Sequence, residues 1–214
     1  MSNRSLCPTT PSAGYLTSGF TSFCRASAAC LCLILVLTGF SLNCPGAQAG
    51  KKVSPFRLKD DGGQTHTLED YAGKIVVLEF WSFKCPPAAA YDERMTALES
   101  NYRSRGVVIL AVDSNKNEPA DEVRLNRANR KLPFPVLMDQ DGTLADSLGA
   151  SLTPSLVILD GTGTIRYRGA IDNNKRAGEH GRIAYAEDAL DALLSGQSVP
   201  QAEVKMSGGC SIKR

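Results

Sequence analysis

Residues 75–87 read IVVLEFWSFKCPP, and this stretch decides the fold class. Its first half is β-branched, aromatic and almost continuously apolar, which is typical of a strand that is covered on both faces. Its second half places Cys85 before two prolines, and proline favours the first turn of a helix. Apolar residues then recur at the period of an amphipathic helix: Tyr91, Met95, Leu98 and Tyr102. The stretch therefore predicts a central strand, a turn that carries Cys85, and a helix from Ala88 onward.

Strand-like and helix-like segments alternate on both sides of this stretch. Further strands are expected at Pro55–Leu58, Val107–Val112, Phe134–Met138, Ser155–Leu159 and Ile165–Gly169. Further helices are expected at Glu118–Arg130, Leu144–Leu148 and Ile183–Leu194. Crossover helices require parallel strand pairs, whereas a closing hairpin requires an antiparallel pair. The pattern predicts an α/β sandwich with a mixed central sheet flanked by helices, opened by a β-hairpin at Asp60–Gly63.

The first fifty residues differ in composition from the rest of the chain. They contain no Asp or Glu, an apolar run at 28–40 that is short for a membrane span, and small residues around position 49. This layout is typical of a secretory signal that is cleaved after Ala49. We expect a signal at 1–49, one domain at 50–195, and a flexible tail at 196–214. The domain would then be exported to the periplasm or another extracytoplasmic space, and an uncleaved signal that tethers it to the membrane is the alternative.

Loss of the leader changes both the charge and the cysteine count. It leaves 22 basic against 22 acidic residues with no basic stripe, which excludes a typical nucleic-acid binder. Of seven cysteines only Cys85 and Cys210 remain. In an oxidising compartment such a pair forms either a structural disulfide or a redox couple, and spacing alone does not decide between them.

The strand at 77–81, followed four residues later by Cys85-Pro86-Pro87, resembles the active-site strand and turn of thioredoxin-like redoxins. The resemblance covers roughly residues 53–194. The opening hairpin and Tyr71–Lys74 are similar to the N-terminal hairpin of the peroxiredoxin-like AhpC/TSA branch. The resemblance implies a three-layer thioredoxin-like sandwich, a thiol-dependent oxidoreductase or antioxidant activity, and no cofactor.

The resemblance also implies roles for individual residues. Cys85 is the expected nucleophile, because a helix start stabilises a thiolate. Thr153-Pro154 is similar to the threonine and cis-proline that these folds place against the cysteine to pair with an extended substrate. Glu79 occupies the place of a buried acid that accepts and returns a proton. Trp81 and Ser82 are expected walls of the substrate site.

One departure from the thioredoxin pattern is decisive. Ala88 stands where thioredoxins carry their second cysteine, so the usual local disulfide is excluded. Cys210 is the only internal substitute, and its Gly-Cys-Ser-Ile-Lys setting is similar to the endings of redoxins that have lost the nearby partner. The tail is long enough to reach Cys85. Intramolecular pairing, intermolecular pairing and no role for Cys210 stay open.

Three activities are consistent with these residues. In the leading hypothesis Cys85 attacks a disulfide or a peroxide and is resolved by Cys210 or by an external thiol reductant. A thiol peroxidase proper would need an arginine near the thiolate, for which Arg166 and Arg168 are candidates. The alternative from another class is a redox-inert module that binds an extended partner. No metal site is expected, because the pattern of copper-delivery relatives is broken at Ala89 and because His66 and His180 are interpreted as exposed loop residues.

Overall fold

The computed structural model describes residues 48–174 and 181–214. Most of the expected leader, at 1–47, and His180 lie outside the described residues. Within the described ranges, none of the helices combines the length and the apolar character needed to cross a membrane.

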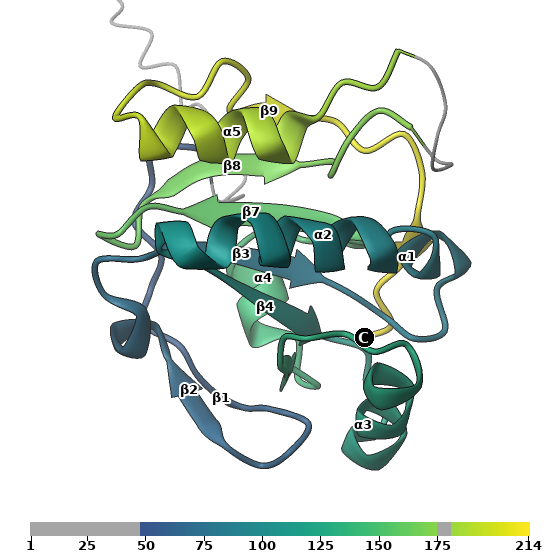
Figure 1. Ribbon diagram of the computed structural model, residues 1–214. Coiled ribbons are helices and arrows are strands. Elements are labelled where there is room, and N and C mark those ends of the chain that lie inside the picture. The colour runs from purple at the N-terminus through teal and green to yellow at the C-terminus, as the bar shows by residue number, and fades with distance from the viewer. Residues whose placement is uncertain (1–47, 175–180) are drawn as a thin grey trace, which may run out of the picture. The chain divides into compact units, whose positions relative to one another are not determined.

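A six-stranded mixed sheet runs through the middle of the domain (Figure 1) in the order β5-β4-β3-β7-β8-β9. Three strands are parallel: β3 (Ile75–Phe80), β4 (Val107–Asp113) and β5 (Val136–Met138). β7 (Ser155–Leu159) runs antiparallel to β3, and β8 (Ile165–Gly169) closes the hairpin with β7. The expected combination of parallel crossovers and a terminal hairpin is therefore confirmed. A separate hairpin of β1 (Arg57–Lys59) and β2 (Thr65–Thr67) opens the domain, as predicted.

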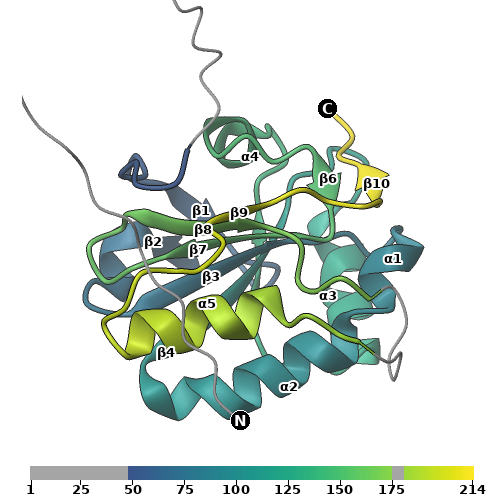
Figure 2. The same cartoon turned by 90° about the horizontal axis from the view of Figure 1, so that it is seen from above.

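Helices cover both faces of the sheet, which gives the predicted three layers. α2 (Asp92–Tyr102) and α5 (Tyr185–Leu194) lie on one face and α4 (Thr143–Ser147) on the opposite face (Figure 2). α3 (Ala120–Asn129) contributes Val123 to the cluster under α2 and α5. The buried apolar residues form two clusters, because successive side chains of the central strand point to opposite faces of the sheet. Val77 belongs to one cluster, and Val76 and Leu78 belong to the other.

The helix expected from Ala88 is divided in two. α1 (Pro86–Ala89) is a single turn, and α2 begins only at Asp92. The Tyr91 hydroxyl between them donates to Asp172 Oδ1 at 3.1 Å and to the Asn174 carbonyl at 2.7 Å. This anchor to the loop after β8 fixes Tyr91, where the helix axis changes. Local periodicity contains no signal for such a long-range anchor.

The prediction of a tail without regular structure is wrong for two segments. β9 (Glu203–Val204) extends the sheet beside β8, and β10 (Cys210–Ser211) pairs antiparallel with β6 (Leu152–Thr153). Beyond β10, Ile212 is buried in the cluster around α4, and its N–H donates to the Ser151 carbonyl at 3.0 Å. Docking therefore depends on contacts with distant segments, among them the burial of Ile212 and backbone pairing, and such contacts form no periodic pattern.

Candidate active site

Cys85 lies at the start of α1, after the loop that leaves the central strand. Its side chain is buried, with 1% of the residue exposed. The thiol makes no capping hydrogen bond to the helix and instead donates to the Thr153 carbonyl, with a Sγ to O distance of 3.2 Å. A helix of one turn has only a small dipole, so the electrostatic field at its N-terminus is weaker than the resemblance implied. The Cys85 backbone thus begins α1, while its thiol is oriented by the Thr153 carbonyl.

The Thr153-Pro154 peptide bond is cis, as the resemblance implied. Thr153 is itself buried, with 1% of the residue exposed, and forms the end of β6 directly before β7. The Thr153 carbonyl oxygen accepts a hydrogen bond from the Cys85 thiol. Because this carbonyl is part of the cis peptide bond, Thr153 and Pro154 both lie next to Cys85. The structure thus brings together Cys85, Thr153 and Pro154 as predicted.

Cys210 reaches the same threonine from the C-terminal segment. In β10 it is the register partner of Thr153, and the Thr153 hydroxyl donates to the Cys210 carbonyl at 3.4 Å. Both cysteines are free thiols. The Cys85 thiol lies within hydrogen-bonding reach of Cys210 and raises the pKa of the Cys210 thiol above its usual range, with burial adding to the effect. The two thiols are therefore neighbours across Thr153.

Gly209 permits this approach. It has a φ of +148°, and a Cβ at this position would lie 2.6 Å from the Thr153 carbonyl oxygen. A side chain here would both strain the backbone and collide with β6. We therefore expect Gly209→Ala to displace β10 and to increase the alkylation rate of Cys210 about five- to 150-fold, which corresponds to a docking loss of about 1–3 kcal/mol. Mass-spectrometric thiol labelling with time measures that rate.

Gly196→Ala is the matched control for this variant. Gly196 also has a positive φ, of +69°, but no atom lies within 4 Å of its added Cβ. An equal rise in Cys210 labelling in both variants, or no rise in Gly209→Ala, would contradict the docking account.

Glu79 lies in the middle of the central strand and is fully enclosed. Both of its carboxyl oxygens are buried without a hydrogen-bond partner among the described residues. Burial, and secondarily the neighbouring Asp92 carboxylate, raise the pKa of Glu79 to about 8. The side chain therefore carries its proton at neutral pH, as a buried proton-exchanging acid requires. No hydrogen bond joins it to Cys85 within the described ranges, so its catalytic role stays a prediction.

The raised pKa of Glu79 predicts an unusual pH dependence of stability. Between the unfolded value of 4.5 and the folded value of about 8, the folded chain binds more protons than the unfolded chain, so stability falls as pH rises. Glu79→Gln removes this loss. Relative to the wild type, its free energy of unfolding should rise by several kcal/mol across that window, at about 1.4 kcal/mol per pKa unit. Urea unfolding at a series of pH values measures the difference.

Glu93→Gln on α2 is the control, because Glu93 is exposed. A Glu79→Gln difference that does not change with pH would show that Glu79 is not held protonated by the fold.

Trp81 and Ser82 are both buried and are held by acids. The Trp81 indole N–H donates to Asp92 Oδ1 at 3.2 Å, and Arg130 lies over its ring at 5.3 Å from the ring centre. The Ser82 hydroxyl donates to Glu118 Oε1 at 2.5 Å. Both side chains are thus enclosed in contacts with charged residues, and their role as walls of a substrate site stays a prediction.

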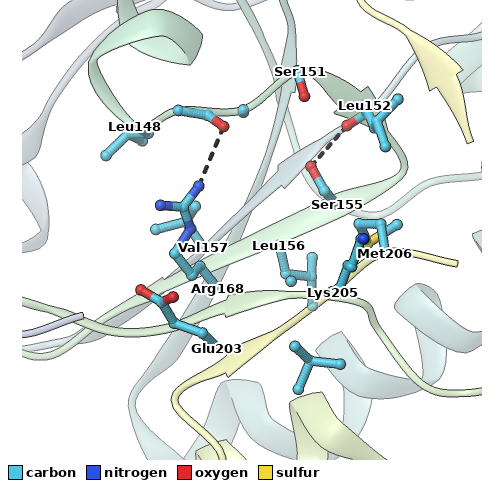
Figure 3. A pocket seen from close by; sticks show the side chains of 14 residues that line it. Leu148, Ser151, Leu152, Ser155, Leu156, Val157, Arg168, Glu203, Lys205 and Met206 are labelled. Atoms are coloured by element: carbon cyan, nitrogen blue, oxygen red, sulfur yellow. Dashed lines mark hydrogen bonds between the residues drawn. The ribbon is translucent and has the colours of Figure 1, made fainter. Parts of the chain in front are cut away.

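A cavity of about 570 Å³ opens beside the cysteine turn. Its walls are mainly apolar and come from both the turn and the C-terminal segment: Pro86, Pro87, Tyr91, Pro154, Ile171 and Met206. A second cavity, of about 580 Å³, lies between the Leu148–Leu152 segment and β9 (Figure 3). The first adjoins Pro154 directly.

A family comparison now adds to the geometry. The model of the AhpC/TSA family matches residues 49–168, which is more than half of the chain. The chain belongs to the AhpC/TSA family. The ResA thiol-disulfide oxidoreductase of Geobacillus thermodenitrificans is 30% identical over 142 residues, covering 64% of this redoxin and 80% of the relative. ResA of Halalkalibacterium halodurans is 33% identical over 119 residues, covering 56% of this chain and 66% of the relative.

Two solved structures resemble this redoxin along most of their length. A conserved protein of Geobacillus kaustophilus has a TM-score of 0.71 at 28% identity and covers 78% of this chain and 93% of its own. A hypothetical protein of Sinorhizobium meliloti has a TM-score of 0.69 at 27% identity and covers 78% and 94%. Together with the layer order, they confirm the thioredoxin-like fold.

The two arginines considered for a peroxidase site in this redoxin have other contacts. Arg166 pairs with Asp160 at 3.8 Å, beside the β7–β8 turn. The Arg168 guanidinium donates to the Gly149 carbonyl at 3.2 Å (Figure 3). Neither contact involves the Cys85 turn, so these arginines do not support peroxide binding there.

The histidine interpretation needs one correction. His66 is buried in β2, where its ring nitrogens face the Tyr71 hydroxyl and Asp60, rather than exposed in a loop. Its hydrogen-bond partners explain its burial. In the part of the chain that the structure describes, no three His, Cys, Asp or Glu side chains are grouped so that they could hold a metal ion.

Sequence reasoning missed a set of buried polar residues behind the cysteines. They lie at the end of β4 and in the loop that follows it: Asp113, Asn115 and Glu118. The sequence did contain a signal for this set, namely two acids and an amide at the end of a buried parallel strand. Folds of this kind build their functional sites at the carboxyl ends of parallel strands.

Proposed function

We propose that this redoxin is a thiol-disulfide oxidoreductase in which Cys85 is the nucleophile and Cys210 is the resolving cysteine. The single observation that carries the proposal is that both cysteines contact Thr153, one through its thiol and the other as its strand partner. The ResA names of the relatives support the reaction class. Ala88, buried where thioredoxins have their second cysteine, explains why the C-terminal segment supplies the partner.

The reaction would proceed in two exchanges. The Cys85 thiolate attacks one sulfur of a substrate disulfide, which forms a mixed disulfide and releases the first substrate thiol after protonation. The Cys210 thiolate then attacks the Cys85 sulfur, which releases the second substrate thiol and leaves a Cys85–Cys210 disulfide. An external thiol reductant restores both thiols. The substrate is reduced by two electrons and the cysteine pair is oxidised by two.

Access to Cys85 requires movement in the reduced form. Because Cys85 is 1% exposed and β10 pairs beside it, β10 must leave Thr153 before a large substrate reaches the sulfur. β10 contains only two residues, but its separation also breaks the hydrogen bonds that tie Ile212 to Ser151 and Lys213 to Asn115. Cys210 then returns to the same place to resolve the mixed disulfide.

Turnover of a disulfide tests the proposed function. Reduction of insulin by dithiothreitol should be accelerated by the wild-type protein, and consumption of hydrogen peroxide under the same conditions should be much slower. Faster use of peroxide than of disulfide would favour the peroxidase. No acceleration of either reaction, with both thiols intact, would favour the redox-inert binding module.

We further propose that the domain acts outside the cytoplasm, on disulfide-containing substrates and with an external thiol reductant. The composition of 1–49 supports export. We expect the mature protein to begin at Gly50 and to be recovered from the extracytoplasmic fraction, as N-terminal sequencing would show. Recovery of the intact chain from the membrane would indicate a tether, and recovery from the cytoplasm would overturn export.

A further inference from the structure

The buried residues Glu118, Asp113 and Asn115 connect the two segments that carry the cysteines. Each is at most 2% exposed. All three lie in or just after β4, the strand next to the central strand. They lie behind the cysteine site, and the exchange reaction proposed above does not use them chemically.

Glu118 holds the loop that leads to Cys85. Its Oε1 accepts the Ser82 hydroxyl at 2.5 Å, and its Oε2 accepts the Phe83 N–H at 3.0 Å. The Ser82 hydroxyl also accepts the Lys84 N–H at 3.2 Å, and the Cys85 N–H donates to the Ser82 carbonyl at 3.3 Å. The carboxylate thus fixes the backbone immediately before the nucleophile.

Asn115 holds the segment that follows Cys210. Its side-chain oxygen accepts the Lys213 N–H at 2.8 Å, and the neighbouring Lys116 N–H donates to the Lys213 carbonyl at 3.1 Å. Asp113 orients Asn115, since its Oδ1 accepts both the backbone N–H at 2.8 Å and the side-chain amide at 3.0 Å.

The two halves are joined directly, because the Glu118 N–H donates to the Asn115 carbonyl at 3.1 Å. Asp113 Oδ2 is buried without a hydrogen-bond partner among the described residues. Burial, followed by the neighbouring Glu118 carboxyl, raises the pKa of Asp113 to about 8. Asp113 therefore carries its proton at neutral pH, while Glu118 accepts the two hydrogen bonds from the Cys85 loop.

We propose that Glu118 and Asn115, the latter oriented by Asp113, are positioning residues that hold the Cys85 loop and the Cys210 segment in register through one buried network. The inference rests on the proposed function, because register matters only if the two thiols react with each other. A fixed register raises the effective concentration of one thiol at the other and so stabilises their disulfide.

The equilibrium constant between the Cys85–Cys210 disulfide and glutathione tests the proposal. We expect Glu118→Ala and Asn115→Ala each to lower it about tenfold, which is about 30 mV in the potential of the pair. The double variant should lose little more than either single variant, because both act through one network. Glu118→Gln, which can still serve both Ser82 and Phe83, should stay within about threefold of the wild type.

Asp61→Asn is the structural control. Asp61 is equally buried and paired with Arg127 at 2.8 Å, but it contacts neither cysteine segment. It should lower the melting temperature and leave the equilibrium constant unchanged. Unchanged constants in Glu118→Ala or Asn115→Ala, additive effects in the double variant, or an equal change in Asp61→Asn would each overturn the proposal.

Amide hydrogen exchange separates this proposal from the proposed function. In Glu118→Ala, exchange of the Lys213 amide should accelerate although Glu118 does not contact it. If the wild type forms no Cys85–Cys210 disulfide, the proposed function fails, and this exchange still decides whether the network exists. An unchanged Lys213 exchange rate in Glu118→Ala would overturn the network itself.

Discussion

Cys85→Ser should abolish catalysed disulfide reduction, with a loss of at least about a thousandfold in turnover of insulin by dithiothreitol. A serine hydroxyl is not ionised near neutral pH and cannot form the mixed disulfide, because the thiolate is the nucleophile. Packing should change little, since serine is close in size to the buried cysteine and its hydroxyl can donate to the Thr153 carbonyl as the thiol does. The loss should therefore appear in activity and not in folding.

Two measurements make the Cys85→Ser result decisive. Circular dichroism and the melting temperature should stay close to those of the wild type. The comparison with Cys210→Ser, which retains the nucleophile, then assigns the loss to the first exchange. Substantial residual turnover in Cys85→Ser would contradict the assignment of Cys85 as nucleophile.

Cys210→Ser should stop the reaction after its first exchange. Without an internal resolving thiol, the mixed disulfide between Cys85 and the substrate accumulates until an external thiol attacks it. Because Cys210 is the strand partner of Thr153, to which the Cys85 thiol donates, its contribution is that of a positioned intramolecular group. We expect turnover at low reductant to fall at least about a hundredfold, while the first exchange stays as fast as in the wild type.

Rapid quenching with an alkylating agent, followed by intact-mass analysis, would detect the trapped mixed disulfide in Cys210→Ser. High dithiothreitol should restore much of the turnover, because an external thiol then replaces Cys210. Wild-type turnover in Cys210→Ser at low reductant, without a trapped species, would show that Cys210 has no role in resolution.

Local sequence patterns predicted the sheet and the place of Cys85 at a helix start well. The central strand, β7 and β8 were found because each is a short apolar run bounded by turn residues, and that signal lies within the segment itself. Cys85 was found because it follows such a strand and precedes two prolines. The resemblance to redoxins then identified Thr153-Pro154, which lies far away in sequence but adjoins Cys85 in the fold.

Features that depend on distant partners could not be predicted in the same way. The docking of β10 depends on Ile212 in a remote cluster and on a glycine that fits against Thr153. Glu118 looks like an ordinary acid before a polar helix, yet it is buried beneath the Cys85 loop. In each case the contacting residues lie far away in the sequence. The local pattern of apolar and polar residues therefore contains no signal for the contact.

A single redox couple of Cys85 and Cys210 within one chain would leave a disulfide between them after oxidation. Peptide mapping by mass spectrometry of the oxidised protein, digested without reduction, detects that bond. We expect one linked peptide pair that contains Cys85 and Cys210, from protein that migrates as a monomer on a non-reducing gel. Two free thiols after oxidation, or a linkage found only between separate chains, would contradict it.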